Sequence, residues 1–441
     1  MHDRRVVITG LGAITPVGLS APESWAALKA GTCGITEIDR FDTADFKVKV
    51  AAEVKGFDPL AYLSKQEARH NDTCTQYAIA AADEAVRDSG LVIPGGHLTQ
   101  QAEQAAEGSE GADAAQAPQA NIEAERVGVY IGSGIGGFET MCDQVGKFLE
   151  GGPRKVSPFM IPMMIANMPA GAVSIRHHAL GPTLPVVTAC ATSSHTIGEA
   201  FHAIRHNQAD AILAGGAEAA ILPVAIAAFT SCMALTKNPD PATACRPFDA
   251  NRDGFVMGEG AVVLVLEELE HAKARGARIY AEIVGYGNTA DAFHITSPDP
   301  EAGGIARALR LAIDEAGLKP EEGLYINAHG TSTKLNDACE TKGFKAALGE
   351  QAAHAAHISS TKSMTGHMLG ATGAMEALAC AMTLHDGVIA PTIGLAEPDP
   401  ACDLDYTPGE AKPFDGRWAL STSLGFGGHN AALAFRKYEE D

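Results

Sequence analysis

The sequence predicts a layered α/β fold built from two similar halves. Short apolar, β-branched stretches alternate with stretches of helical spacing along the first part of the chain. The same alternation begins again at Ile279–Val284, a strand, and continues with a helix at Glu301–Gly317 and a strand at Leu324–Ala328. We therefore expect an N-terminal half over residues 1–277 and a C-terminal half over residues 278–441.

The first half begins with a predicted strand from Arg5 to Gly10, a loop rich in glycine and proline, and a helix that Ser20 caps. A second helix is predicted from Ser64 to Ser89. The later strands of this half are predicted at Arg126–Ile131, Ala211–Gly215 and Val262–Leu266.

A change of composition interrupts this half between residues 94 and 124. The segment consists mainly of Gln, Ala, Glu, Gly and Asp, with almost no large apolar side chain. Such a segment buries too little surface to offset the entropy of ordering it. We expect a mobile, acidic surface insertion that carries no chemistry.

Bulk properties exclude several classes of protein. The net charge of −21 argues against a nucleic-acid partner, which requires a concentrated basic face. No apolar stretch has the length of a membrane span, and the opening residues lack the apolar region of a signal peptide. The nine scattered cysteines contain no Cys-x-x-Cys pair and indicate neither a disulfide framework nor a zinc site. We expect a cytoplasmic protein with free thiols.

Cys190 is the strongest candidate for a reactive group. Apolar residues from Pro185 lead up to it, and residues of helical spacing follow it, so it falls where a strand passes into a helix. The unpaired N–H groups at the start of a helix favour the thiolate, which is the nucleophilic form of cysteine. A buried structural cysteine is the alternative.

Two histidines and a lysine occupy similar positions in the second half. His329 follows the strand that ends at Ala328, while Lys362 and His367 follow a predicted strand at His357–Ser360. Ligands of open α/β sheets gather at the carboxyl ends of strands. One histidine in such a place is more often structural, but two beside small hydroxyl residues indicate chemistry.

Three further motifs resemble known sites and are rejected. Gly132-Ser-Gly-Ile-Gly-Gly137 matches a dinucleotide-binding fingerprint, but the required second strand with its acidic residue is missing. The loop at Asp249–Gly260 lacks the final glutamate of a calcium loop. Ser359-Ser-Thr-Lys362 lacks the tripeptides that accompany it in penicillin-binding proteins.

The glycine-rich segment Gly425-Phe-Gly-Gly428 places Phe426 between flexible residues. It is either a turn with a buried ring or a gate whose N–H groups serve as oxyanion donors.

With these motifs assembled, the chain resembles the β-ketoacyl-[acyl-carrier-protein] synthases, most closely those of the second type. The resemblance runs from Val6 to Asn430 and rests on five motifs in order. They are Thr188-Ala-Cys190, Arg246-Pro-Phe-Asp with Gly254-Phe-Val, Asn327-Ala-His329-Gly-Thr-Ser-Thr333, Thr361-Lys-Ser-Met-Thr-Gly-His367 and Gly425-Phe-Gly-Gly428. It implies a thiolase-like fold of five layers, α-β-α-β-α, and a homodimer.

The resemblance also implies a decarboxylative condensation of acyl- and malonyl-acyl carrier protein in fatty-acid elongation, without metal or organic cofactor. Cys190 would carry the acyl chain, His329 and His367 would hold the malonyl thioester oxygen, and Lys362 would support them. The N–H groups of Cys190 and Phe426 would form the oxyanion hole.

Other positions carry binding roles by the same resemblance. Pantetheine would be bound by Thr331 and Thr333, the glycine loop would include Gly427 and Gly428, Glu376 would lie behind Lys362, and Ile135 with Phe426 would gate the acyl tunnel. The carrier protein would dock on four basic residues, namely Lys65, Arg69, Arg154 and Lys155.

The sequence departs from the family pattern at Cys232 and Met233, where an arginine is expected. Three other kinds of protein share part of this pattern. A thiolase would need a second cysteine near the C-terminus, whereas the last one here is Cys402. A non-catalytic chain-length factor would lack Cys190. A stand-alone polyketide ketosynthase would share the chemistry and stays open.

Overall fold

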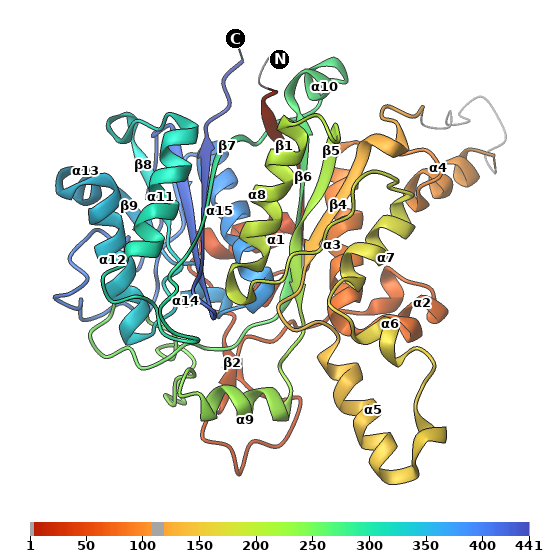
Figure 1. Cartoon of the computed structure of the whole chain (residues 1–441), viewed down its shortest axis with the longest axis horizontal. Coiled ribbons are helices and arrows are strands. Elements are labelled where there is room, and N and C mark those ends of the chain that lie inside the picture. Colours follow the sequence, from red (N-terminus) through yellow and green to blue (C-terminus); the bar gives the residue numbers. More distant parts are fainter. Residues whose placement is uncertain (1–3, 108–118, 441) are drawn as a thin grey trace.

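The computed structural model describes residues 4–107 and 119–440, and its centre is a nine-stranded sheet in the order β4-β5-β6-β1-β7-β13-β12-β8-β9 (Figure 1). The strands of the first half are β1 (Val6–Ile14), β4 (Val127–Gly132), β5 (Ala211–Glu218) and β6 (Gly260–Glu268). The strands of the second half are β7 (Ala281–Ala290), β8 (Leu324–Asn327), β9 (His357–Ser359), β12 (Trp418–Gly425) and β13 (His429–Arg436).

The two halves of this sheet have the same topology. In the first half β1 pairs antiparallel with β6, β6 antiparallel with β5, and β5 parallel with β4. In the second half β7, β13, β12 and β8 repeat this sequence of directions, and β9 adds one parallel strand. Only three residues at the start of β1, Val6 to Ile8, pair with β7 and join the halves. The expected duplication is therefore visible in strand order and direction.

Helices complete five layers. The inner helices α8 (Thr192–Arg205) and α15 (Thr372–Asp386) contact strands of both halves and lie between them. The helices α3 (Thr73–Ser89) and α7 (Met168–His177) cover the outer face of the first half, and α11 (Gly303–Ala316) with α12 (Lys334–Leu348) covers the second (Figure 1). The order is α-β-α-β-α, as the resemblance implied.

The remaining elements are short or peripheral. The helices are α1 (Ala21–Lys29), α2 (Lys65–His70), α4 (His97–Glu107), α5 (Phe138–Gly151), α6 (Met160–Met164), α9 (Pro223–Ser231), α10 (Leu269–Ala274), α13 (Glu350–Ala355) and α14 (Lys362–Thr365). Two small pairs are β2 (Thr36–Glu37) with β3 (Val50–Ala51) and β10 (Val388–Ile389) with β11 (Lys412–Pro413). Within the described ranges, every helix is too short or too polar to cross a membrane.

Close approach of α3 to β1 explains the glycine at position 12. A Cβ atom built there would lie 1.9 Å from the carbonyl oxygen of Ala81 on α3, far inside van der Waals contact. Any larger residue would push the helix away from the sheet. The Gly-Leu-Gly spacing after the first predicted strand is thus a packing requirement.

The structure corrects two predicted segments of the first half. The predicted helix from Ser64 to Ser89 is divided into α2 and α3, because Asp72 caps α3 by accepting a hydrogen bond from the Cys74 N–H. The predicted insertion at 94–124 is partly ordered: α4 covers 97–107, Thr99 is buried, and Ile122 joins the core. Residues 108–118 of this insertion lie outside the described residues.

The strand predicted before Cys190 is the third correction. The segment 179–188 is irregular: residues 181–184 share backbone hydrogen bonds with Val127 and Val129 of β4, and the one recorded bridge joins Thr183 to Val129. Leu184 and Val187 are exposed on it. Residues 185–188 therefore approach the cysteine without a partner strand among the described residues.

Candidate active site

A strained turn holds Cys190 at the start of an inner helix. The turn is a short 3-10 helix, Ala189–Ala191, that runs directly into α8. Ala189 has φ 52°, in the left-handed region that residues other than glycine rarely adopt. Such strain persists only where the surrounding structure fixes it, and it is frequent at active sites.

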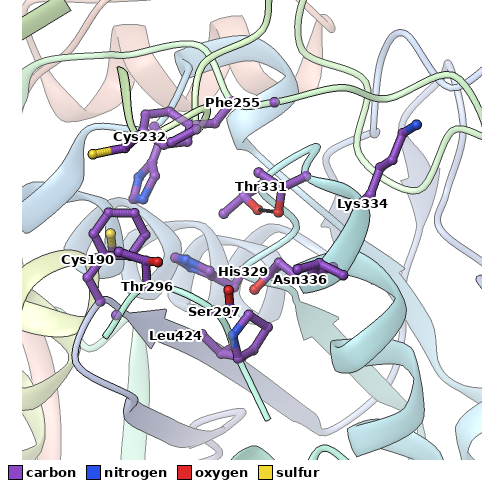
Figure 2. Close-up of a pocket in the computed structure, with 18 of the residues that line it drawn as sticks. Cys190, Cys232, Phe255, Thr296, Ser297, His329, Thr331, Lys334, Asn336 and Leu424 are labelled. Atoms are coloured by element: carbon purple, nitrogen blue, oxygen red, sulfur yellow. Dashed lines mark hydrogen bonds between the residues drawn. The ribbon is translucent and has the colours of Figure 1, made fainter. Parts of the chain in front are cut away.

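The fold brings both predicted histidines to this cysteine. One ligand atom each of Cys190, His329 and His367 lie within 4.8 Å of one another, and all three residues are buried. The two imidazole rings are 5.3 Å apart and nearly perpendicular. All three line a cavity of about 360 Å³ that opens to solvent (Figure 2). A thiol from the first half and two imidazoles from the second thus share one space.

Lys362 and Glu376 lie behind His329 and are completely buried. The Lys362 ammonium group donates to the Glu376 carboxylate and to the His329 carbonyl oxygen, and it donates to His329 Nδ1 at 3.1 Å. Burial raises the pKa of Glu376 to about 7, although Lys362 opposes the rise. The lysine is thus positioned by a buried carboxylate, as the resemblance implied for Glu376.

These contacts define the hydrogen positions of both imidazoles. Because Lys362 donates to Nδ1 of His329, the hydrogen of that neutral ring is on Nε2. The Leu369 N–H lies 3.3 Å from His367 Nδ1, which gives His367 the same tautomer. His367 Nε2 is buried and has no hydrogen-bond partner among the described residues. The ring can therefore donate to an oxygen that enters the cavity.

Burial controls the charge of all three groups. It lowers the pKa of His329 and His367 well below the usual value, and the Lys362 charge lowers both further. Both imidazoles are therefore neutral at physiological pH. Burial also raises the pKa of Cys190 to about 11, although Lys362 and the Phe426 N–H oppose this. The helix start was expected to favour the thiolate, and desolvation of the buried charge acts against it.

This pKa predicts the pH dependence of Cys190 alkylation. Only the thiolate reacts with iodoacetamide. As long as the pH is below the pKa, the thiolate fraction increases about tenfold for each unit by which the pH rises. We expect the rate at Cys190 to increase steadily from about pH 7 to about pH 10. Mass spectrometry of the Cys190 peptide measures this rate separately from the other cysteines. A rate that is constant above neutral pH would contradict the raised pKa.

The predicted glycine loop closes one side of the cavity. It is the turn between β12 and β13, where Gly427 and Gly428 have φ of 90° and 76° and thereby permit a reversal that other residues rarely adopt. The Phe426 N–H lies close enough to the Cys190 sulfur to lower the pKa of the thiol. Phe426 and Gly428 line the cavity, whereas the Gly427 N–H donates to the Ile295 carbonyl.

Other predicted residues separate into two groups. Thr331 and Thr333 line the cavity and share a hydrogen bond of 2.9 Å (Figure 2). Ile135 is not part of this lining and is 36% exposed. The ring nearest to Phe426 is Phe229 on α9, with centroids 6.4 Å apart. The gating pair of Ile135 and Phe426 therefore stays a prediction.

The four predicted docking residues are exposed and lie away from the cavity lining. Lys65 and Arg69 are on α2, and Arg154 and Lys155 are on the 3-10 turn Pro153–Lys155.

Several lining residues were missed by the sequence analysis. Phe255 lies edge-on to His367 with centroids 5.1 Å apart, and it belongs to a motif quoted only for its family likeness. Residues 296–298 and Asn336 line the opposite wall (Figure 2). Residues 296–298 are in a loop and Asn336 is in the first turn of α12, and none of them belongs to a motif recognised in the sequence, so only the fold identifies them.

The Cys190, His329 and His367 group is also the one set of ligands within the described ranges close enough together for a metal ion. Its nitrogen and sulfur atoms would suit zinc. However, the Lys362 ammonium group is 3.1 Å from His329 and opposes a cation there. We therefore interpret the group as an acyl-transfer site.

Comparison with known families agrees with this interpretation. The model of the beta-ketoacyl synthase N-terminal domain matches residues 3–102 and 98–272, and that of the C-terminal domain matches 280–396. The chain belongs to the beta-ketoacyl synthase family. It is 49% identical over 438 residues to 3-oxoacyl-[acyl-carrier-protein] synthase 2 of Staphylococcus aureus strain N315, covering 99% of both chains.

Solved ketosynthase structures show the same fold. A beta-ketoacyl synthase from Burkholderia phymatum is 37% identical with a TM-score of 0.85, covering 99% of this chain and 100% of that one. A type II polyketide ketosynthase, solved with its acyl-carrier protein and bound to a hexaketide, is 31% identical with a TM-score of 0.87 and the same coverage.

Proposed function

We propose that this protein is a 3-oxoacyl-[acyl-carrier-protein] synthase of the second type, which acts in fatty-acid elongation. It condenses acyl- and malonyl-carrier protein to 3-oxoacyl-carrier protein, carbon dioxide and free carrier. The observation that carries this proposal is the group of one thiol and two neutral imidazoles within 4.8 Å in a cavity open to solvent. The full-length likeness to synthases of this type supplies the reaction.

In the first half-reaction Cys190 is the nucleophile. Its sulfur attacks the acyl thioester carbonyl, and the N–H groups of Cys190 and Phe426 stabilise the oxyanion of the tetrahedral intermediate. The carrier thiol departs with the proton that Cys190 loses. The support for this role is the Phe426 N–H, which lies close enough to the sulfur to lower the pKa of the thiol.

In the second half-reaction the two histidines act as donors. The malonyl group loses carbon dioxide, and the electron pair of the broken bond forms an enolate on the thioester. The Nε2–H groups of His329 and His367 donate to the enolate oxygen. The enolate carbon then attacks the acyl-Cys190 carbonyl, and the released thiolate takes a proton from solvent. Lys362 holds His329 in the required tautomer.

The remaining roles follow the cavity. Thr331 and Thr333 bind the pantetheine arm, which enters between them and the glycine loop containing Gly427 and Gly428. Phe426 separates the cavity from the acyl tunnel, which Ile135 borders.

A direct assay tests the function. The purified protein is incubated with malonyl-carrier protein and acyl-carrier proteins of graded length, and both the products and the Cys190 peptide are followed by mass spectrometry. We expect acylated Cys190 followed by a 3-oxoacyl-carrier protein two carbons longer. Absence of both species with every primer would refute the proposal.

The same assay addresses the polyketide alternative. The ketosynthase solved with a hexaketide has this fold, but its identity is lower than that of the synthase from Staphylococcus aureus. We expect one elongation per reduced primer. Accumulation of poly-3-oxo chains would favour the polyketide assignment instead.

Docking of the carrier protein is proposed at the two basic pairs. His70, beside Arg69, stacks on Phe159 with ring centroids 3.9 Å apart, which brings α2 close to the segment that follows Lys155. The four exposed cations form a surface suited to an acidic partner on a chain of net charge −21. A location in the cytoplasm belongs to the same proposal.

A homodimer is proposed from the segment before Cys190. Leu180, Leu184 and Val187 are exposed along it, and residues 185–188 lack a partner strand among the described residues. An unpaired edge with apolar side chains is suited to pairing with a second copy.

Leu184→Glu is expected to yield monomers, because it places a charge in the apolar contact. Size-exclusion chromatography with light scattering measures the mass. Leu311→Glu is the matched control, since Leu311 is similarly exposed but lies on the outer helix α11. The dimer interface would lie elsewhere if both variants have the mass of the wild type.

A further inference from the structure

The active-site cavity carries a second thiol that the proposed reaction does not use. Cys232 lines the same cavity as Cys190, and Figure 2 draws both sulfur atoms on its lining. All nine cysteines are in the described part of the chain, and Cys232 is the one that is exposed, whereas Cys190 is buried. The two thiols therefore differ sharply in access.

Exposure places Cys232 where the cavity meets solvent. Its backbone is fixed there, because it ends α9 and its N–H donates to the Ala228 carbonyl at 3.0 Å. The chain then turns through Met233, which has φ 57° and is 82% exposed. A reagent that approaches from outside meets the Cys232 sulfur before that of Cys190.

The cavity lining includes a hydrogen-bond donor that the proposed reaction occupies only while the malonyl group is bound. His367 Nε2 is buried and lacks a partner among the described residues. Thr331 and Asn336 add polar groups to the lining. A group attached at the opening and bearing amide or carboxylate oxygens would find donors within the cavity, so its attachment would be favoured over a bare surface thiol.

We propose that Cys232 is a site of reversible S-thiolation by small disulfides, and that the attached group closes the active-site cavity. The Cys232 thiolate attacks one sulfur of R–S–S–R, the disulfide bond breaks, and RS⁻ leaves and takes up the proton that Cys232 released. The product is a mixed disulfide, Cys232–S–S–R. An excess of thiol reverses the step.

The test compares two disulfides on the full-length protein. Oxidised glutathione attaches a large group with amide and carboxylate oxygens, and 2-hydroxyethyl disulfide attaches a small one. We expect peptide mass spectrometry to find the first adduct on Cys232 while Cys190 is still unmodified. The glutathione adduct should remove most of the condensation activity, the small adduct should remove less, and dithiothreitol should restore both.

Cys232→Ser and Cys142→Ser are the paired variants, since Cys142 is a half-buried thiol outside the cavity lining. Each variant is compared with itself before and after treatment. We expect Cys232→Ser to keep its starting activity and Cys142→Ser to lose it like the wild type. Equal loss in Cys232→Ser, or glutathionylated Cys232 with full activity, would overturn the proposal.

The expected loss of condensation activity rests on the proposed function, whereas the assignment of Cys232 as the modified residue does not. Protein that shows no condensation before treatment would count against the function, while the mass measurement would still test the site.

Discussion

Cys190→Ala is expected to abolish condensation while decarboxylation of malonyl-carrier protein continues. Without the sulfur there is no thiol to receive the acyl chain as a thioester, so elongation falls by several orders of magnitude. His329 and His367 are unchanged and, in the proposed mechanism, still donate to the enolate oxygen. Carbon dioxide release from malonyl-carrier protein and formation of 3-oxoacyl product are measured in parallel.

The matched control is Cys142→Ala, which removes a half-buried thiol from α5 outside the cavity lining. It should leave both activities at the wild-type level. Elongation by the Cys190→Ala protein at a rate near that of the control would show that another residue carries the acyl chain.

His367→Ala is expected to lose decarboxylation and therefore condensation. The ring contributes one of two donors to the enolate oxygen, and loss of one such donor costs about 10²- to 10³-fold in rate. Cys190 should still accept an acyl group, because its sulfur and oxyanion donors are unchanged. Carbon dioxide release measures the decarboxylation step, and mass spectrometry of the Cys190 peptide measures the acylation step.

His206→Ala serves as the control, since His206 is an exposed histidine at the end of α8, outside the cavity lining. Loss of acylation together with decarboxylation in His367→Ala would point to collapse of the site rather than to a missing donor. Unchanged carbon dioxide release would remove His367 from the proposed mechanism.

Much of the fold was predictable because it depends on local patterns. Alternation of apolar residues located the strands, and the boundaries of β4 and β8 differ from the predicted ones by at most one residue. The helix predicted at 64–89 was wrong because a cap at Asp72 divides it, which apolar spacing does not reveal. The strand predicted before Cys190 was wrong for another reason: residues 185–188 have no neighbouring strand to pair with among the described residues.

The structural duplication of the two halves is hardly visible in the amino-acid sequence. Cys190 and Gly370 occupy equivalent turns, since each follows a left-handed residue, Ala189 with φ 52° and Leu369 with φ 48°, and each precedes Ala-Thr and an inner helix. Only two residues of sequence identity mark this equivalence. Strand order and backbone geometry show it plainly because they are preserved when side chains are not.

The sequence by itself determined which groups the protein possesses: a cysteine before a helix, two histidines and a lysine after strands, and a phenylalanine among glycines. Tertiary structure decided how those groups behave. Burial lowers the pKa of both imidazoles and raises that of the Cys190 thiol, whereas the helix start alone favours the thiolate. The reason is physical: the cost of desolvating a charge depends on everything that surrounds it, and that surrounding comes from both halves of the chain.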